Sequence, residues 1–146
     1  MIESYTNTSQ TIAPEGLLSF ATNDILTGCT VLHSAGSTSF TLKRPGFYYV
    51  SFTGTGAITG ATAGAITVNL LKNGVALPGA TATQTSASAT DIRTVNFSKI
   101  VQVLPSCCAI NNTTTLTFQN AGLDTTYSNV NWEEAHEALQ EWHDKI

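Results

Sequence analysis

The chain has 146 residues, of which 42% are hydrophobic and only 11% are charged, and its formal net charge is −4 at pH 7. This length suits one domain with an appendage, and the scarcity of Lys and Arg argues against nucleic acid, which needs a basic stripe to neutralise phosphates. No stretch approaches the run of roughly 18 apolar residues that would span a bilayer, so we expect no membrane partner.

The N-terminal part gives few functional signals. Its first ten residues, MIESYTNTSQ, lack the basic and apolar regions of a signal peptide. Cys29 joins Cys107 and Cys108 in an odd set of three, which favours free thiols but leaves open a vicinal bond or a bridge from Cys29. His33 is a lone histidine in the strand-like segment VLHS, and we interpret it as structural.

Period-two alternation dominates the middle of the chain and predicts strands with one buried side. The segments that show it are FYYVSFTGT, AITVNLL and TTTLTFQ, with Tyr48, Val50, Phe52, Ile66, Val68, Leu70, Leu116 and Phe118 on the buried faces. Turn signals separate them, at Arg44–Gly46, Asn73–Gly74, Pro78–Gly79 and Asn120–Gly122. With eight or nine short strands and regular turns, the pattern predicts an all-β antiparallel sandwich or jelly roll.

Three segments fit this pattern less well. The small-residue stretches from Ala57 to Ala65 and from Ala80 to Thr90 are interpreted as loops. In the run from Ile92 to Leu104, Lys99 falls in the same phase as the apolar residues, where a lysine facing the core would be costly. Either a bulge shifts the phase at Lys99, or that side of the strand meets another subunit.

The body also resembles a known family. The stretch SFTLKRPGFYYVSFTGT, followed by VNLLKNGVALPGA and a Thr-rich strand near LTFQNAG, is similar to the trimeric jelly rolls of the complement globular-head and tumour-necrosis-factor-like superfamily. It most resembles the heads of bacterial collagen-like spore-surface glycoproteins and related phage structural proteins. The resemblance covers about Leu17 to Val130. It implies a ten-strand, two-sheet homotrimer that acts as a structural or adhesive head on an extracellular surface, spore or virion, and is not an enzyme.

The chain departs from that family at both ends of the head. No Gly-x-y stalk precedes it. After SNVN, where such heads have an apolar final strand, the sequence continues as WEEAHEALQEWHDKI, which holds five of the ten acidic residues and both tryptophans. We therefore expect a head domain over residues 1–131 and a separate amphipathic segment over 132–146. The replacement of half a strand favours an engineered chimera.

The segment 132–146 is predicted to be a short C-terminal α-helix. Asn131 suits the N-cap, acidic residues follow it, and Lys145 lies in the last turn. A 3-4 spacing marks one apolar seam, which consists of Trp132, Ala135, Leu139, Trp142 and Ile146. A second seam is equally regular and includes His136 and His143, and the sequence does not choose between them.

A helix this short needs a partner surface. It could fold back on the head, bundle with its copies around a three-fold axis, or bind another protein. In the bundle, His136 and His143 would each form a ring of three imidazoles, and three histidines with water are the ligand set of a catalytic zinc site.

Motifs of other enzymes are missing. His136–Glu137 does not continue as HExxH, because position 140 is Gln140, and no G-x-S-x-G elbow occurs. The sequence therefore favours a non-enzymatic trimeric head without cofactor, whose helix mediates assembly or partner binding. The alternative is a zinc-type histidine ring, which could be hydrolytic, built on the trimer.

Overall fold

The computed structural model describes residues 1–27, 30–60, 63–104 and 114–137. Regular structure in these residues is entirely β, and they contain no helix long and apolar enough to cross a membrane. The strands are β1 (Ile2–Thr6), β2 (Gln10–Ile12), β3 (Thr22–Leu26), β4 (Val31–Leu32), β5 (Ser39–Leu42), β6 (Gly46–Ile58), β7 (Gly64–Lys72), β8 (Val75–Ser86), β9 (Arg93–Val103), β10 (Thr114–Asn120) and β11 (Thr125–Glu137).

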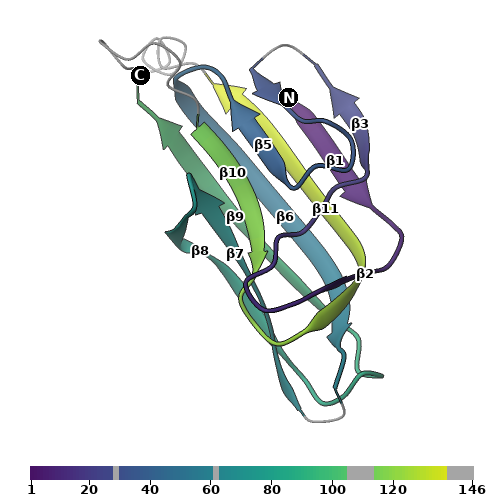
Figure 1. The fold of residues 1–146 in the computed structure, drawn as a ribbon. Helices are drawn as coiled ribbons and strands as arrows, with labels where there is room; N and C mark the ends of the chain where they lie inside the picture. Colours follow the sequence, from purple (N-terminus) through teal and green to yellow (C-terminus); the bar gives the residue numbers. More distant parts are fainter. Residues whose placement is uncertain (28–29, 61–62, 105–113, 138–146) are drawn as a thin grey trace.

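These strands form two antiparallel sheets that pack face to face (Figure 1). One sheet has the order β3-β1-β11-β6-β9, with β2 also paired to β11, and the other has the order β4-β5-β10-β7-β8. The chain passes repeatedly from one sheet to the other. Among the described strands, β4 with β5 and β7 with β8 are the consecutive ones that pair, as in a jelly roll. The predicted all-β antiparallel jelly-roll sandwich is thus confirmed.

The alternation seen in the sequence fills the space between the sheets. Every residue predicted to face the core from the three alternating segments is buried, with no more than 1% of its surface exposed. They are joined by residues of the N-terminal strands and of β11, including Ile2, Leu18, Phe20, Phe40, Val130 and Trp132. One continuous core therefore runs from the first strand to the last.

Of the predicted turns, Asn73–Gly74 has the expected geometry and Pro78–Gly79 does not end a strand. Asn73 and Gly74 join β7 to β8 with φ angles of 52° and 82°, as a type I′ hairpin requires. Gly79 lies inside β8 with a φ of 80°, opposite a shift in the β7–β8 register. The prediction of a loop from Ala80 is wrong as far as Ser86, because these small residues pair with β7.

The end of the described chain corrects the C-terminal helix. Residues 132–137 continue β11, which pairs with β1 from Val130 to Glu134 and with β6 from Thr125 to Glu137. From Val130 to Glu134 the strand is hydrogen-bonded on both sides, whereas an isolated fifteen-residue helix is only marginally stable in water. The strand runs without a break through the expected boundary between residues 131 and 132.

The rest of the expected helix, including Leu139, Trp142, His143 and Ile146, lies outside the described residues.

Candidate functional site

The outer face of β6 and β9 carries an exposed apolar pair. Because Tyr48 and Val50 point into the core, Tyr49 between them points outward, and 52% of its surface is exposed. Its direct cross-strand partner on β9 is Ile100, which is 57% exposed. We call these two residues the Tyr49–Ile100 patch.

Along β6 and β9 the surroundings of the patch are polar but uncharged, whereas on β11 the exposed Glu133 pairs with Ser51 on the same outward face. The next pairs along the two strands are Ser51 with Ser98 and Thr53 with Asn96. The outward residues of β6, and those of β9 from Thr94 to Gln102, include no ionisable carboxylate, amine or guanidinium. The β6 and β9 part of this face can be buried against another protein without desolvating a charge, and a tyrosine beside an aliphatic residue is typical of interface centres.

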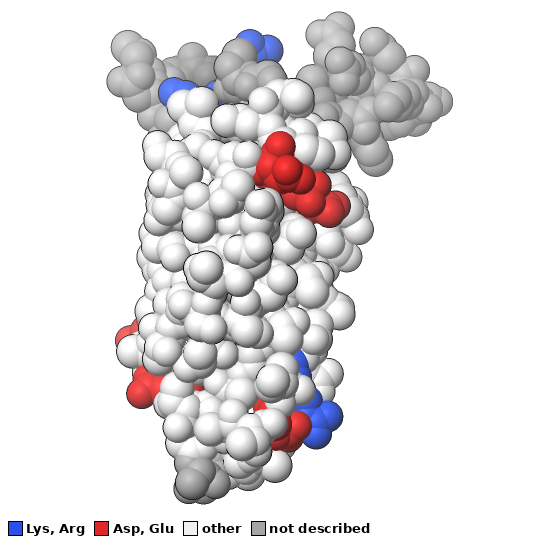
Figure 2. Space-filling view, turned by 90° about the vertical axis from the view of Figure 1, so that its right-hand side faces the viewer, with Lys and Arg blue, Asp and Glu red and all other residues white. Residues whose placement is uncertain are grey.

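Charge is sparse elsewhere on the surface as well. On the face drawn in Figure 2, acidic and basic side chains lie towards the two ends, with an uncharged surface between them. One ion pair among these groups joins Arg93 and Asp91 at 3.0 Å.

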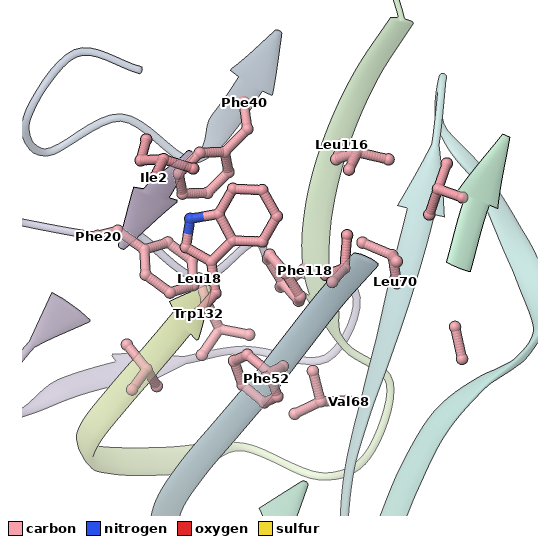
Figure 3. Packing of buried hydrophobic residues seen from close by; sticks show 14 of the residues in the cluster. Ile2, Leu18, Phe20, Phe40, Phe52, Val68, Leu70, Leu116, Phe118 and Trp132 are labelled. Atoms are coloured by element: carbon pink, nitrogen blue, oxygen red, sulfur yellow. The ribbon is translucent and has the colours of Figure 1, made fainter. Parts of the chain in front are cut away.

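Trp132, expected as the first anchor of a helix interface, is instead a core residue. None of its surface is exposed, and its indole ring lies 4.1 Å from Phe40 and 5.5 Å from Phe118, measured between ring centroids. Figure 3 shows the indole surrounded by Ile2, Phe20, Phe40 and Phe118. Alternation along β11 turns it inward, so it cannot also bind a partner.

Glu134 follows Trp132 on the same inward face and is the most unusual ionisable group described. It is 1% exposed, neither carboxylate oxygen has a hydrogen-bond partner among the described residues, and its strand neighbours are Ile2 and Val50. Burial raises the pKa of Glu134 to about 7, with a smaller opposing effect from the Met1 amino group. The side chain is therefore largely a neutral acid below pH 7 and about half ionised near pH 7.

His33 is buried in a way that agrees with a structural role. Its ring stacks on Phe40 at 4.2 Å, and its two nitrogens contact Asn23 Oδ1 and the Ser37 carbonyl oxygen. Burial lowers the pKa of His33 below its ordinary value, and the hydrogen bond to Ser37 opposes this effect. Both ring nitrogens are engaged within the fold and are not presented to a ligand.

In the described part of the chain, no group of three or more His, Cys, Asp or Glu side chains could hold a metal ion. His136 belongs to β11, where it pairs with Tyr48, and His143 lies outside the described residues. Ala135 pairs with Tyr49 in the same way. The histidine ring and the zinc that it would bind therefore stay predictions.

Two shallow hollows lie around the β6–β7 end of the sandwich. One, of about 370 Å³, is lined largely by small and aliphatic residues such as Ala57, Ile92 and Ser128. The other, of about 340 Å³, lies between Pro14, Thr59 and Leu123. The second hollow is also lined by Asp124, but the Thr59 hydroxyl donates to the backbone carbonyl of Asp124, 3.4 Å away, and no hydrogen bond joins it to the carboxylate among the described residues.

Sequence reasoning missed the patch, although the sequence contains a signal for it. Tyr49 and Ile100 are the large apolar residues in the outward phase of strands whose inward phase the alternation predicts. The burial of Glu134 had no comparable signal, because the helical interpretation placed it on a polar face.

Comparison with known proteins supports the fold and leaves function open. No protein-family model matches the chain, and no curated protein matches it. Among solved structures, the globular domain of zebrafish complement 1qA protein is 12% identical, with a TM-score of 0.58 and coverage of 90% of this chain and 92% of that chain. Murine APRIL is 9% identical, with a TM-score of 0.57 and coverage of 90% and 96%. The resemblance to complement globular-head and tumour-necrosis-factor-like jelly rolls is thus shown at the level of fold.

Proposed function

We propose that this chain is a non-enzymatic structural or recognition head that assembles as a homotrimer through the sheet face carrying the Tyr49–Ile100 patch. The observation that carries the proposal is this exposed tyrosine–isoleucine pair, whose neighbours along β6 and β9 are uncharged. Likeness in fold to the complement 1qA globular domain supports a head of this kind.

The patch suits closed association. Leaving two large apolar side chains half exposed costs free energy that burial would recover, at roughly 25 cal/mol for each Å² removed from water. In a cyclic assembly every subunit makes the same contacts. The patch of each subunit is therefore buried in the same way, and none stays exposed. A homotrimer on an extracellular surface is the arrangement that the family resemblance implies.

The proposal is tested by the solution mass. One subunit is 15.4 kDa, so a trimer should scatter light as a particle near 46 kDa, three times that mass. Ile100→Glu places a charge in the patch and should yield a folded monomer. Leu32→Glu is the matched control, because Leu32 is 45% exposed but lies on β4 of the other sheet, and this variant should stay trimeric.

Thermal melting of each variant separates loss of assembly from loss of fold. A wild-type chain that is monomeric at micromolar concentration contradicts the trimer. A trimer that Ile100→Glu leaves intact while folded contradicts the assigned face.

For the residues beyond β11, the anchors Leu139, Trp142 and Ile146 are proposed to contact a partner protein. Trp142→Ala should weaken that contact without lowering the melting temperature of the head. The zinc alternative requires a melting temperature that falls on adding chelator, and loss of that response in the His136→Ala, His143→Ala double variant.

A further inference from the structure

Lys99 occupies a core-facing position on a terminal strand of its sheet. It shares its phase along β9 with the buried Val95 and Val101, and the β6–β9 register runs from Gly46 to Val103 without a shift. The bulge considered from the sequence is therefore absent. Lys99 is only partly exposed, and no hydrogen bond or ion pair of its ammonium group occurs among the described residues.

The ammonium group of Lys99 points towards the terminal strand of the opposite sheet. A Cβ atom placed on Gly79 of β8 would lie 3.6 Å from Lys99 Nζ. β8 and β9 end the two sheets on the same side of the sandwich, where Figure 1 shows them next to each other. We call this region the β8–β9 seam.

β8 is itself irregular at the seam. Pro78 has no amide hydrogen to donate to another strand, and Gly79 follows with a φ of 80°. The register against β7 shifts here, between the pairs Asn69–Thr81 and Leu71–Ala76. The outer edge of β8 is therefore bent and lacks one donor at the point that faces Lys99.

A second lysine reaches the seam from β7. Lys72 Nζ donates a hydrogen bond of 2.8 Å to the backbone carbonyl of Gln102 in β9. The Gln102 carbonyl therefore already accepts a hydrogen bond from within its own subunit. Lys99, Lys72 and Pro78 thus all lie at the β8–β9 seam.

From this arrangement we infer that the β8–β9 seam is built to reject a strand from a second copy of this chain, so that copies join through sheet faces and not through strand edges. Terminal strands expose backbone donors and acceptors that invite pairing, and an inward-pointing lysine, a proline and a bulge each oppose it. A strand added to β9 would enclose the Lys99 ammonium between apolar layers, where an unpaired charge is costly. The joining of copies through sheet faces rests on the proposed function, whereas the rejection of an added strand does not depend on the number of subunits.

The test is Lys99→Val, which continues the apolar phase of Val95 and Val101. Size distributions are measured by sedimentation velocity over a range of protein concentrations, with thioflavin T fluorescence to detect sheet extension. We expect a severalfold rise in species larger than the wild-type particle, growing with concentration, and a rise in fluorescence. Pro78→Thr, which restores a donor, should act in the same direction and should add to Lys99→Val.

Lys43→Val is the matched control, because it makes the same change of residue and charge at an exposed position outside the seam. Both valine variants change the net charge from −4 to −5. A difference in size distribution between the two variants therefore does not come from net charge. Lys99→Arg keeps the charge and should behave as wild type.

A folded Lys99→Val protein with the wild-type size distribution and fluorescence at every concentration overturns the inference. If that variant does not fold, the same measurements on Pro78→Thr decide the question. The mass of the wild-type protein tests the trimer separately, so the two ideas can fail independently.

Discussion

At the scale of single residues, Trp132 decides how the end of the chain folds. As a fully buried side chain among Ile2, Phe40 and Phe118, it links β1, β5, β10 and β11. Its indole nitrogen has no hydrogen-bond partner in the described part of the chain, so its contribution is that of packing and not of polar recognition.

Truncation of this side chain should therefore affect stability and not binding alone. Trp132→Ala should lower the free energy of unfolding by about 3–5 kcal/mol, the range for removing a large buried aromatic. Urea unfolding followed by circular dichroism measures the change. Leu32→Ala on β4 of the other sheet serves as control, because Leu32 is exposed, and it should change stability by about 0.5 kcal/mol or less. Equal effects of the two substitutions would contradict the core assignment.

Glu134 makes a prediction about pH. Its pKa is about 7 in the folded protein against 4.5 in the unfolded chain, so the folded state holds more protons between these values. Folding thus favours the protonated form of Glu134. Its contribution to the free energy of unfolding is fully present below pH 4.5 and is lost as the pH rises through 7. The loss should amount to about 3 kcal/mol, at roughly 1.4 kcal/mol per pKa unit.

Denaturant unfolding at pH 5 and pH 8 measures this change. Glu134→Gln should remove most of the decline and raise stability at pH 8. Glu133→Gln is the control, because Glu133 is exposed on the opposite face of the same strand and should leave the decline unchanged. An identical pH profile in wild type and Glu134→Gln would show that Glu134 is solvated.

At the scale of elements, the β7–β8 hairpin depends on its two turn residues. Gly74 has a φ of 82°, and no described atom lies within 4 Å of the place that a Cβ would take, so a side chain there meets strain without a clash. Gly74→Val should therefore destabilise by about 1–2 kcal/mol through backbone strain alone. Thermal and urea unfolding measure it, and an unchanged midpoint would mean that the turn can adopt another type.

The elements differ in how far the sequence determines them. β6, β7 and β10 were predictable because each repeats apolar residues with period two against a single core. β2 and β4 have three and two residues, too few to show a period, and they exist because a neighbouring strand offers hydrogen bonds.

The C-terminal helix was predicted from spacing that is compatible with two structures. Val130, Trp132 and Glu134 are also two apart, but the acid in the third position hid the strand pattern. Pairing with β1 and β6 overrides the local helical preference, and long-range pairing of this kind cannot be read from a local window. For the same reason the sequence could place Tyr49 and Ile100 on outward faces of their strands, but it could not show that the two residues are cross-strand partners.

At the scale of the whole molecule, the last described strand completes the sheet. A chain stopped after Asn131 loses Trp132 and the part of β11 that pairs with Ser4, Ile2 and the first half of β6. We expect it to show no cooperative thermal transition, whereas a chain stopped after Glu137 should melt cooperatively. Differential scanning calorimetry distinguishes them, and cooperative melting of the shorter chain would contradict the central role of β11.

The position of β11 also bears on how the protein is made. Because β11 lies between β1 and β6, synthesis leaves that sheet as two unconnected parts until residues 125–137 have left the ribosome. The strands made first must wait, with their inner faces uncovered, for β11, which is made after all of them. Completion of the head therefore follows the emergence of residues 125–137, and a ribosome that pauses before residue 125 would hold a nascent chain suited to binding by chaperones.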